Sequence, residues 1–353
     1  MAVKLDNLHY EFRGIDGYNK PYNFIVSPRE LGKTSMFWLK KHYFLWKKDK
    51  KPLIYTVRQT VEITEALLDS ILDPIINKFT DDNIKFEYAT SNFRDGVVDI
   101  RIKGELFFRI ISLGIKLRRL KSTLVKNVRC AMMDEYIIDP RSQESYLPSE
   151  AFKIKEAYTT WARECDGIFK WYFLANPYSL YNPLFVDWKV QVNKLKIGEF
   201  YVGSNYVIHY AKLSEELKEL ILKRNPNYKF DVDYMQYALE GVAKNDKNIK
   251  IDSLPPNYSL KYVFSVMNEM IGVYQKNVVD DSGNKYHCMF LDEVSKKRVV
   301  YCFDFGDLME RFIILSKDER FKLERFKDAL RRRQVSFENI NCYYLIEEVY
   351  QRI

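Results

Sequence analysis

The 353-residue sequence has no apolar run long enough to cross a membrane, and its first residues, MAVKLDNLHYEFRG, lack the apolar core of a signal peptide. We therefore expect no membrane partner. The five cysteines are scattered, and none forms a C-x-x-C pair. This spacing argues against a disulfide framework and a structural zinc site, and it suits a reducing cytoplasm. The sequence has no internal repeats and no low-complexity tract.

Composition allows a full hydrophobic core. Hydrophobic residues make up 47% of the chain, and the length is sufficient for two domains or for one large domain with an appendage. The net charge of +8 suggests an anionic partner such as nucleic acid. A chain that is merely rich in lysine would have the same charge, so both readings stay open.

The first part of the chain alternates between apolar strands and amphipathic helices. We expect strands at 22–27, 51–58, 128–136 and 168–176, helices at 35–48, 61–79 and 149–164 with Ser149 as an N-cap, and short strands between 84 and 113. Strands that alternate with helices indicate an α/β fold with a parallel sheet. We assign residues 1–199 to this domain.

The pattern changes after residue 199. Residues 200–252 read as a mostly helical lid or linker subdomain, which ends in a polar run before Pro255-Pro256. Beyond it, segments such as LKYVFSVMN and MIGVYQKNVV alternate with turn signals and are followed by helices. Residues 253–353 are therefore expected to form a smaller α+β domain.

The stretch NFIVSPRELGKT, residues 23–34, resembles a phosphate-binding P-loop between a strand and a helix. The motif is G-x-x-x-x-G-K-[ST], and Ser27 stands where the first glycine belongs. Gly32, Lys33 and Thr34 supply the remaining parts: backbone N–H groups and a lysine for phosphate, and a hydroxyl for Mg²⁺. Arg29 lies within the same loop. A Gly-Lys-Thr tripeptide also occurs by chance, so a second motif is needed.

The strand RCAMMDEY supplies that second motif, because it ends in Asp134 and Glu135. An aspartate at the tip of a neighbouring strand can hold Mg²⁺ through water, and the following glutamate can polarise the attacking water. An isolated Asp-Glu pair is more often a solvated turn. Together with the P-loop about a hundred residues earlier, it indicates a site that binds and hydrolyses ATP with Mg²⁺.

The order of these motifs resembles that of the phi-29-like DNA-packaging ATPases of small tailed phages, which are relatives of the terminase large subunits. The resemblance covers residues 22 to about 190 and is carried by NFIVSPRELGKT, LIYTVRQ, KSTLVKNVRCAMMDEYIIDP, YLPSE and FLANPYSLYNPLF. It implies a P-loop ATPase domain of the terminase type and an RNase H-like C-terminal domain. It also implies a homomeric ring, pentameric in this family, that packages double-stranded DNA into a procapsid through the portal, in the cytoplasm of the infected host cell. A structural RNA is a further partner in part of the family.

The resemblance also implies roles for single residues. Lys33 and Thr34 would bind phosphate and Mg²⁺, Asp134 the metal, and Glu135 would act as the catalytic base. Arg163 falls where the family places an arginine finger that acts on the neighbouring subunit. Basic positions near the nucleotide or the interface correspond to Arg58 and Lys121, and Asn176 could sense the γ-phosphate. Surface charge or strand capping explains these last three equally well.

Sequence-independent DNA contacts use Lys and Arg, because phosphates are common to every sequence. Our candidates are Arg118, Arg119, Lys121 and Arg141, and residues 331–333 form another basic cluster. For each of them the alternative is a charged residue on a solvated surface with no ligand.

The C-terminal domain lacks a nuclease signature. Nuclease chemistry needs several carboxylates around two Mg²⁺ ions. The first strand, KYVFSVMN, carries no carboxylate, and turns or caps explain Asp292, Asp304 and Asp307. We therefore expect a vestigial nuclease domain. Two other functions stay open for the chain: a helicase or another nucleic-acid-remodelling ATPase, and a non-enzymatic nucleic-acid-binding assembly protein with a degenerate P-loop.

Overall fold

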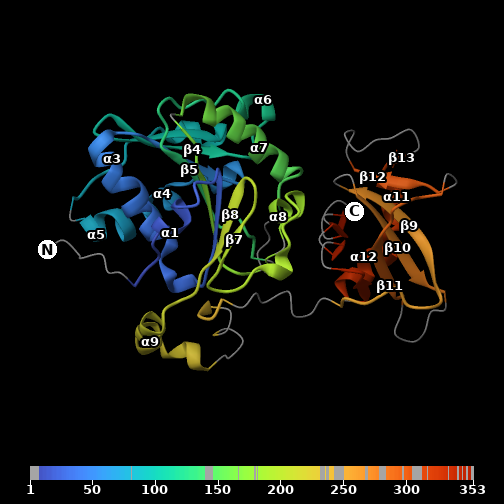
Figure 1. Ribbon diagram of the computed structural model, residues 1–353. Coiled ribbons are helices and arrows are strands. Elements are labelled where there is room, and N and C mark those ends of the chain that lie inside the picture. Colours follow the sequence, from blue (N-terminus) through green and yellow to red (C-terminus); the bar gives the residue numbers. More distant parts are fainter. Residues whose placement is uncertain are drawn as a thin grey trace. The chain divides into compact units, whose positions relative to one another are not determined.

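The computed structural model consists of two compact units, Met1–Leu180 with Gln191–Lys244 and Tyr181–Val190 with Asn245–Ile353 (Figure 1). Each unit is described by itself below. The structure describes residues 8–350 except 81, 140–145, 166, 179, 181, 231–234, 236–237, 242–249, 267–268, 278–283, 296–297, 304–311, 316, 333, 340–341, 344 and 347–348.

The first unit is built on an eight-stranded sheet with the strand order β3-β4-β2-β5-β6-β1-β8-β7. The six strands from β4 to β8 in this order run parallel, and β3 and β7 are antiparallel at the two edges. The strands are β1 Tyr22–Val26, β2 Leu53–Val57, β3 Val97–Ile102, β4 Glu105–Ser112, β5 Cys130–Asp134, β6 Trp171–Ala175, β7 Phe200–Val202 and β8 Tyr206–Tyr210.

The central strands are buried along their whole length, as their uninterrupted apolar sequences predict. All five residues of β1, β2 and β6 are buried. Parallel strands whose two faces are both covered read as continuous apolar runs rather than as alternating ones. The predicted α/β class with a parallel-rich sheet is therefore confirmed.

One long helix leaves the loop after β1. It begins as α2 and continues through a π-helical segment, Phe37–Tyr43, into α3. A second helix, α4, continues into another π-helical segment, Leu72–Asn77. The helices of the unit are α1 Arg13–Asp16, α2 Lys33–Met36, α3 Phe44–Asp49, α4 Glu65–Ile71, α5 Lys78–Thr80, α6 Leu117–Leu120, α7 Glu150–Trp161 and α9 Glu215–Arg224.

Three expectations need correction. Residues 200–210, expected within a helical subdomain, form β7 and β8, and β8 pairs in parallel with β1. The sequence FYVGSNYVIHY has two short runs rich in aromatic and β-branched residues on either side of the turn residues GSN, and so favours a hairpin. Residues 84–89 form only a single bridge, Glu87 to Arg101, because they have no buried face to pack as a strand. Ser149 does occupy the N-cap position of α7, but its side chain makes no capping hydrogen bond.

The second unit contains a six-stranded sheet with the order β13-β12-β9-β10-β11-β14. Strands β9, β10 and β11 form an antiparallel meander, while β12 and β13 continue from β9 in parallel. Phe264, Ile271 and Phe326 belong to its hydrophobic core, so a helix packs on the sheet as expected for an α+β domain. The elements are α8 Pro183–Asp187, β9 Tyr258–Val266, β10 Glu269–Lys276, β11 Tyr286–Phe290, β12 Val300–Cys302, β13 Phe312–Ile314, α11 Lys317–Lys322, α12 Glu324–Arg331 and β14 Val335–Phe337.

Candidate nucleotide site

The loop between β1 and α2 accommodates a serine at the position of the missing first glycine. Ser27 is fully buried; its N–H donates to the carbonyl of Ala175 at 3.1 Å and its hydroxyl donates to the carbonyl of Pro28 at 3.0 Å. Ser27 does not have a positive φ, so its backbone conformation does not require glycine. Gly32 does, with φ +74°, and an added Cβ would lie 2.6 Å from the ring of His9. The backbone of this loop therefore requires glycine at position 32, where the sequence has one, and not at position 27.

Lys33 is held at the carboxyl end of the sheet. Its side chain is buried, and Nζ donates to Oδ1 of Asn176, which follows β6, at 2.8 Å. Burial lowers the pKa of Lys33 to about 8, although Asp134 and Glu135 oppose this shift and Arg29 adds to it. Among the described residues the hydrogen-bond partner of Lys33 Nζ is neutral, so this buried cation is available to an anionic ligand.

Thr34 and Asp134 face each other across neighbouring elements. The Thr34 hydroxyl donates to Oδ2 of Asp134 at 2.8 Å, and the other carboxylate oxygen accepts from the Glu135 N–H at 3.0 Å. Burial raises the pKa of Asp134, and the nearby Lys33 charge lowers it again in part. These side chains meet because β5, β6 and β1 are adjacent and parallel, so their carboxyl ends share one edge.

These donors fit Mg²⁺. A hydroxyl and a carboxylate oxygen are hard ligands, and Mg²⁺ in phosphate sites commonly uses one or two protein oxygens together with water and phosphate. No group of three His, Cys, Asp or Glu side chains suited to a metal occurs within the described part of the chain. A metal ion at Thr34 and Asp134 would therefore depend on ligand oxygens as well as on the protein.

Glu135 lies beside a cavity of about 450 Å³. It is exposed and adopts a left-handed backbone conformation with φ +52°, which is uncommon for a residue other than glycine. Such outliers cluster at functional sites. The cavity is also lined by Thr34, Asp134, Arg58 and Glu62 and by apolar side chains of α4.

Arg58 is anchored by protein groups. Its Nε and Nη2 donate to the two carboxylate oxygens of Glu150 at 2.8 and 3.0 Å, and Nη2 also donates to the carbonyl of Tyr136 at 2.9 Å. Both side chains of the pair are buried. This bidentate pair ties the end of β2 to the start of α7, and its contribution to nucleotide binding stays a prediction.

The other predicted residues lie elsewhere. Arg29 is in the 3₁₀ turn Arg29–Leu31 of the loop, and Arg163 is exposed in the 3₁₀ turn Ala162–Glu164 after α7, outside the lining of the cavity. Arg118 and Arg119 are exposed on α6, where Arg119 pairs with Asp95 at 3.5 Å. Lys121 pairs with Glu156, and Arg141 lies outside the described residues.

Sequence reasoning missed two acidic residues of this region, Glu62 and Glu150. Glu62 lines the cavity, and its carboxylate accepts the N–H groups of Gln59 and Arg58 at 2.5 and 3.4 Å. The signal was Gln59-x-x-Glu62, the spacing of a capping box. Glu150 is the last residue of the YLPSE motif that carries the resemblance, but an acidic residue in the first turn of a helix is ordinary and did not predict the pair with Arg58.

Comparisons with known proteins support the fold. No protein-family model matches the chain, and no curated protein does. Among solved structures, a chain of "The Phi-28 gp11 DNA packaging Motor" superposes with a TM-score of 0.66 at 15% identity over 98% of both chains. A chain of "The bacteriophage Phi-29 viral genome packaging motor assembly" gives 0.61 at 19% identity, over 98% of this chain and 99% of that one. At these identities the likeness shows a shared fold.

Proposed function

We propose that this chain, whose fold is shared with chains of two phage packaging motors, is the ATP-hydrolysing subunit of a viral DNA-packaging motor. One observation carries the proposal: Lys33, Thr34, Asp134 and Asn176 converge at the carboxyl ends of β1, β5 and β6. A buried cation, a hydroxyl and a carboxylate at a strand–loop–helix turn are the parts that hold the phosphates and Mg²⁺ of ATP.

Each side chain has one task in this proposal. Lys33 offsets phosphate charge, and Thr34 and Asp134 hold Mg²⁺ directly or through water. Bound Mg²⁺–ATP supplies the phosphoryl group that is transferred to water. Glu135, exposed beside the cavity, orients that water and accepts its proton. Asn176, which accepts a hydrogen bond from Lys33, senses the γ-phosphate.

The motor would be a homomeric, pentameric ring docked at the portal of a procapsid in the cytoplasm of the infected cell. Arg163, exposed outside the cavity, would act on the ATP of a neighbouring subunit. Arg29 and Arg58 would act near the phosphates, while Arg118, Arg119, Lys121 and Arg141 are candidates for DNA contacts. A structural RNA is a further partner to be tested.

We do not propose nuclease activity. Strand β9, the first of the second unit, carries no carboxylate, and Asp292 is exposed. Asp304 and Asp307 lie outside the described residues. The full chain should leave plasmid DNA intact in Mg²⁺ or Mn²⁺, and metal-dependent cutting would place it with enzymes that cut DNA.

Steady-state hydrolysis of ATP, with and without duplex DNA, tests the proposal. We expect hydrolysis that DNA stimulates and that Lys33→Ala abolishes. The matched control is Lys78→Ala, which removes an exposed lysine of α5 and should behave like the wild type. Near-normal hydrolysis by a folded Lys33→Ala protein would refute the P-loop assignment. Absence of hydrolysis in the wild type would favour the non-enzymatic alternative, and strand separation would favour a helicase.

A further inference from the structure

The parallel sheet has a second edge, opposite to the candidate nucleotide site, where its strands begin. Leu53 pairs with Cys130, and Trp171 pairs with both Ala131 and Tyr22, so β2, β5, β6 and β1 start level with one another. Each of these strands has five residues. At about 3.3 Å per residue, the two edges are roughly 17 Å apart.

Basic residues gather along this edge. Lys20, Lys51, Arg129 and Lys170 each stand just before one of the four strands. Backbone hydrogen bonds confirm that these segments are neighbours: Arg129 N–H donates to Pro52, Ala131 N–H to Lys170 and Trp171 N–H to Pro21. The end of α3 lies here too, because Asp49 pairs with Arg129.

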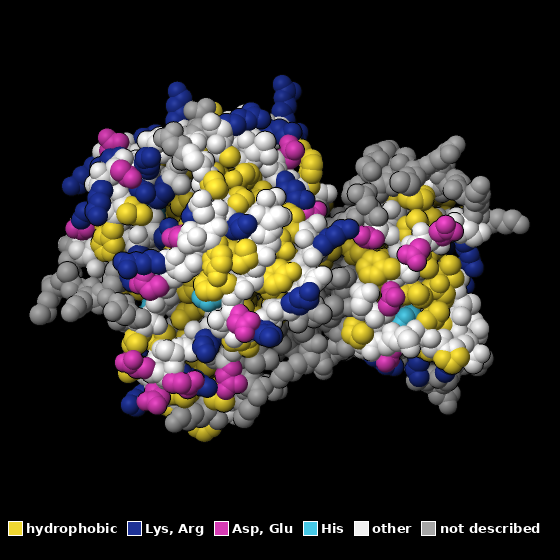
Figure 2. Space-filling model, in the orientation of Figure 1, with side chains coloured by type: hydrophobic (Ala, Val, Ile, Leu, Met, Phe, Trp, Pro, Cys, Tyr) yellow, Lys and Arg dark blue, Asp and Glu magenta, His cyan; other side chains and the backbone are white. Residues whose placement is uncertain are grey.

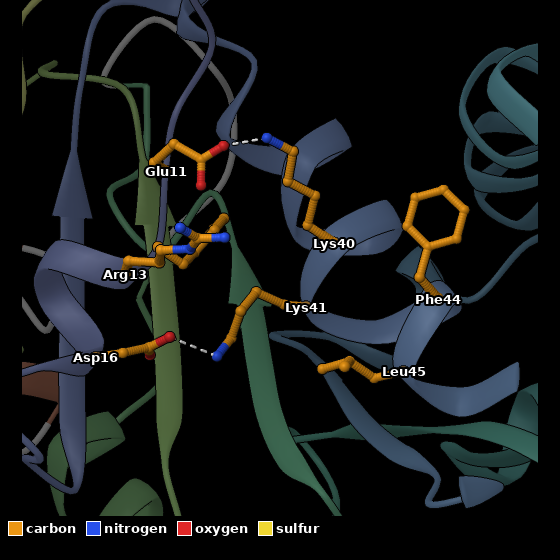
Figure 3. A pocket seen from close by; sticks show the side chains of 8 residues that line it. Glu11, Arg13, Asp16, Lys40, Lys41, Phe44 and Leu45 are labelled. Carbon is orange, nitrogen blue, oxygen red and sulfur yellow. Dashed lines mark hydrogen bonds and ion pairs between the residues drawn. The ribbon is translucent and has the colours of Figure 1, made fainter. Parts of the chain in front are cut away.

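A cavity of about 700 Å³ opens beside α1 in the same region (Figure 3). Two ion pairs cross it, Lys40 with Glu11 and Lys41 with Asp16, and Figure 3 shows the Arg13 side chain between them. Asp16 shows that this cavity lies next to the start of β6. Its carboxylate accepts from the Tyr172 hydroxyl at 2.5 Å, and its carbonyl accepts from Lys170 at 3.1 Å.

We call this surface the basic edge. It consists of Arg13, Lys20, Lys40, Lys41, Lys47, Lys48, Lys50, Lys51, Arg129 and Lys170. Four of the ten pair with carboxylates: Lys40 with Glu11, Lys41 with Asp16, Lys47 with Asp82 and Arg129 with Asp49. Within the described part of the chain the other six residues form no ion pair. Their six positive charges compare with a net charge of +8 for the whole chain. Figure 2 shows Lys and Arg side chains over the part of the molecule that Figure 1 labels α3.

Half of the six uncompensated residues are exposed: Arg13, Lys48 and Lys50. Arg13, Lys48 and Lys51 form no ion pair with any residue that the structure describes, and Arg13 and Lys48 are exposed. Like charges held together repel one another, and an anionic partner relieves that repulsion. Eight of the ten residues are lysines, which protein–protein interfaces contain less often than other surfaces do, whereas lysine readily contacts phosphate as a point charge.

We infer that the basic edge binds the phosphodiester backbone of duplex DNA. That the ligand is DNA rests on the proposed function. That the ligand is a polyanion rests on the charges of the basic edge alone. The four strand starts span roughly 14 Å at about 4.8 Å per strand, enough to reach several phosphates of one duplex. Binding here would leave the nucleotide edge of the sheet free.

The test compares two triple variants that each lose three positive charges. Arg13→Gln/Lys48→Gln/Lys51→Gln removes three of the six unpaired charges of the basic edge, and Arg118→Gln/Arg119→Gln/Lys121→Gln removes three charges at and after α6. Binding to a labelled 30-base-pair DNA of mixed sequence is followed by fluorescence anisotropy at several salt concentrations, without nucleotide. A matched RNA duplex is the second probe, and thermal unfolding confirms that both variants fold.

We expect the basic-edge variant to bind DNA about tenfold more weakly at 0.1 M salt. The slope of log K against log salt should also become less steep by roughly 2 to 3, since each lost phosphate contact contributes about 0.9. The α6 variant should lose less on both measures. Unchanged binding, equal loss in both variants, loss confined to RNA, or no DNA binding by the wild type would each overturn the inference. Hydrolysis by the wild type and its loss in Lys33→Ala are measured separately, so failure of the DNA surface does not imply failure of the ATP site.

Discussion

At the scale of single residues, the candidate site is organised by a few unusual conformations. Gly32 and Glu135 both have positive φ, the first next to Lys33 and the second directly after Asp134. The glycine avoids a clash with His9, whereas the glutamate adopts this conformation at a steric cost. The strain falls on the residue that we propose as the base.

Replacing Glu135 by Gln should separate binding from hydrolysis. The amide has the size of the carboxylate but cannot accept a proton, so ATP should bind normally while turnover falls by at least about a hundredfold. Nucleotide binding measured by fluorescence and hydrolysis measured by phosphate release check this. Glu62→Gln is the matched control, because Glu62 lines the same cavity. Loss of turnover in Glu62→Gln with normal turnover in Glu135→Gln would make Glu62 the base.

The pKa of Lys33 predicts how ATP binding depends on pH. Burial lowers this pKa to about 8 in the folded protein, and bound phosphates would raise it again. ATP affinity should therefore fall above pH 8, by up to about tenfold per pH unit, because binding then requires uptake of a proton. Binding isotherms between pH 7 and 9.5 measure this, with Lys78→Ala as the control. A flat profile would show that Lys33 does not meet the phosphates.

The same shift has the opposite effect on stability. Between pH 8 and the unfolded value of 10.5, the unfolded chain keeps the proton that folded Lys33 has lost. The unfolded state then binds more protons, so the contribution of Lys33 to the free energy of unfolding rises with pH in this window. Above pH 8, the loss of the Lys33 proton therefore lowers ATP affinity and raises the free energy of unfolding.

At the scale of elements, the alternation of strands and helices predicts which residues meet at the site. It does not predict the side-chain pairs that hold the surrounding elements together. Asp134 and Asn176 were identified because each ends an apolar strand, and parallel strands bring such ends to one edge. The pairing of Arg58 with Glu150 could not be foreseen, since it joins residues 92 positions apart by side-chain geometry alone. The hairpin at 200–210 was missed because short strands were read as part of a helical segment.

The buried pair of Arg58 and Glu150 should be important for stability. Arg58→Ala would leave the carboxylate of Glu150 buried without its charge partner, at a cost of about 3–5 kcal/mol in the free energy of unfolding. Arg58→Met/Glu150→Gln removes both charges and keeps an acceptor for the Leu147 N–H, so it should cost clearly less than Arg58→Ala.

Urea denaturation measures both variants. Arg101→Ala is the control, because Arg101 pairs with Asp99 at 3.4 Å on a partly exposed surface and should contribute less than about 1 kcal/mol. If Arg58→Ala unfolds at the same urea concentration as the wild type, the pair is not a structural support, and Arg58 becomes a stronger candidate for nucleotide contact.

At the scale of the whole molecule, the proposed functions divide the sheet between its two edges. Phosphate chemistry is assigned to the carboxyl ends of the strands, and the inferred DNA surface to their starts. The sheet between them has a fully buried core of strands, and a packed element of this kind transmits displacement rather than absorbing it. A motor needs such a connection between the site that hydrolyses ATP and the surface that holds DNA.

The last prediction concerns assembly, because Arg163 does not line the cavity of its own subunit. An arginine finger supplied by a neighbour stabilises charge on the transferring phosphoryl group and increases turnover about a thousandfold or more in known cases. Arg163→Ala subunits should therefore bind ATP but fail to stimulate a neighbour. Mixing them with Lys33→Ala subunits should restore part of the hydrolysis, because some junctions then join an intact Lys33 to an intact Arg163. The control mixes Lys33→Ala with Lys33→Ala/Arg163→Ala subunits, which offer no intact Lys33 and should stay inactive. If well-mixed rings of the first kind show no recovery, Arg163 acts within its own subunit or only supports the turn after α7.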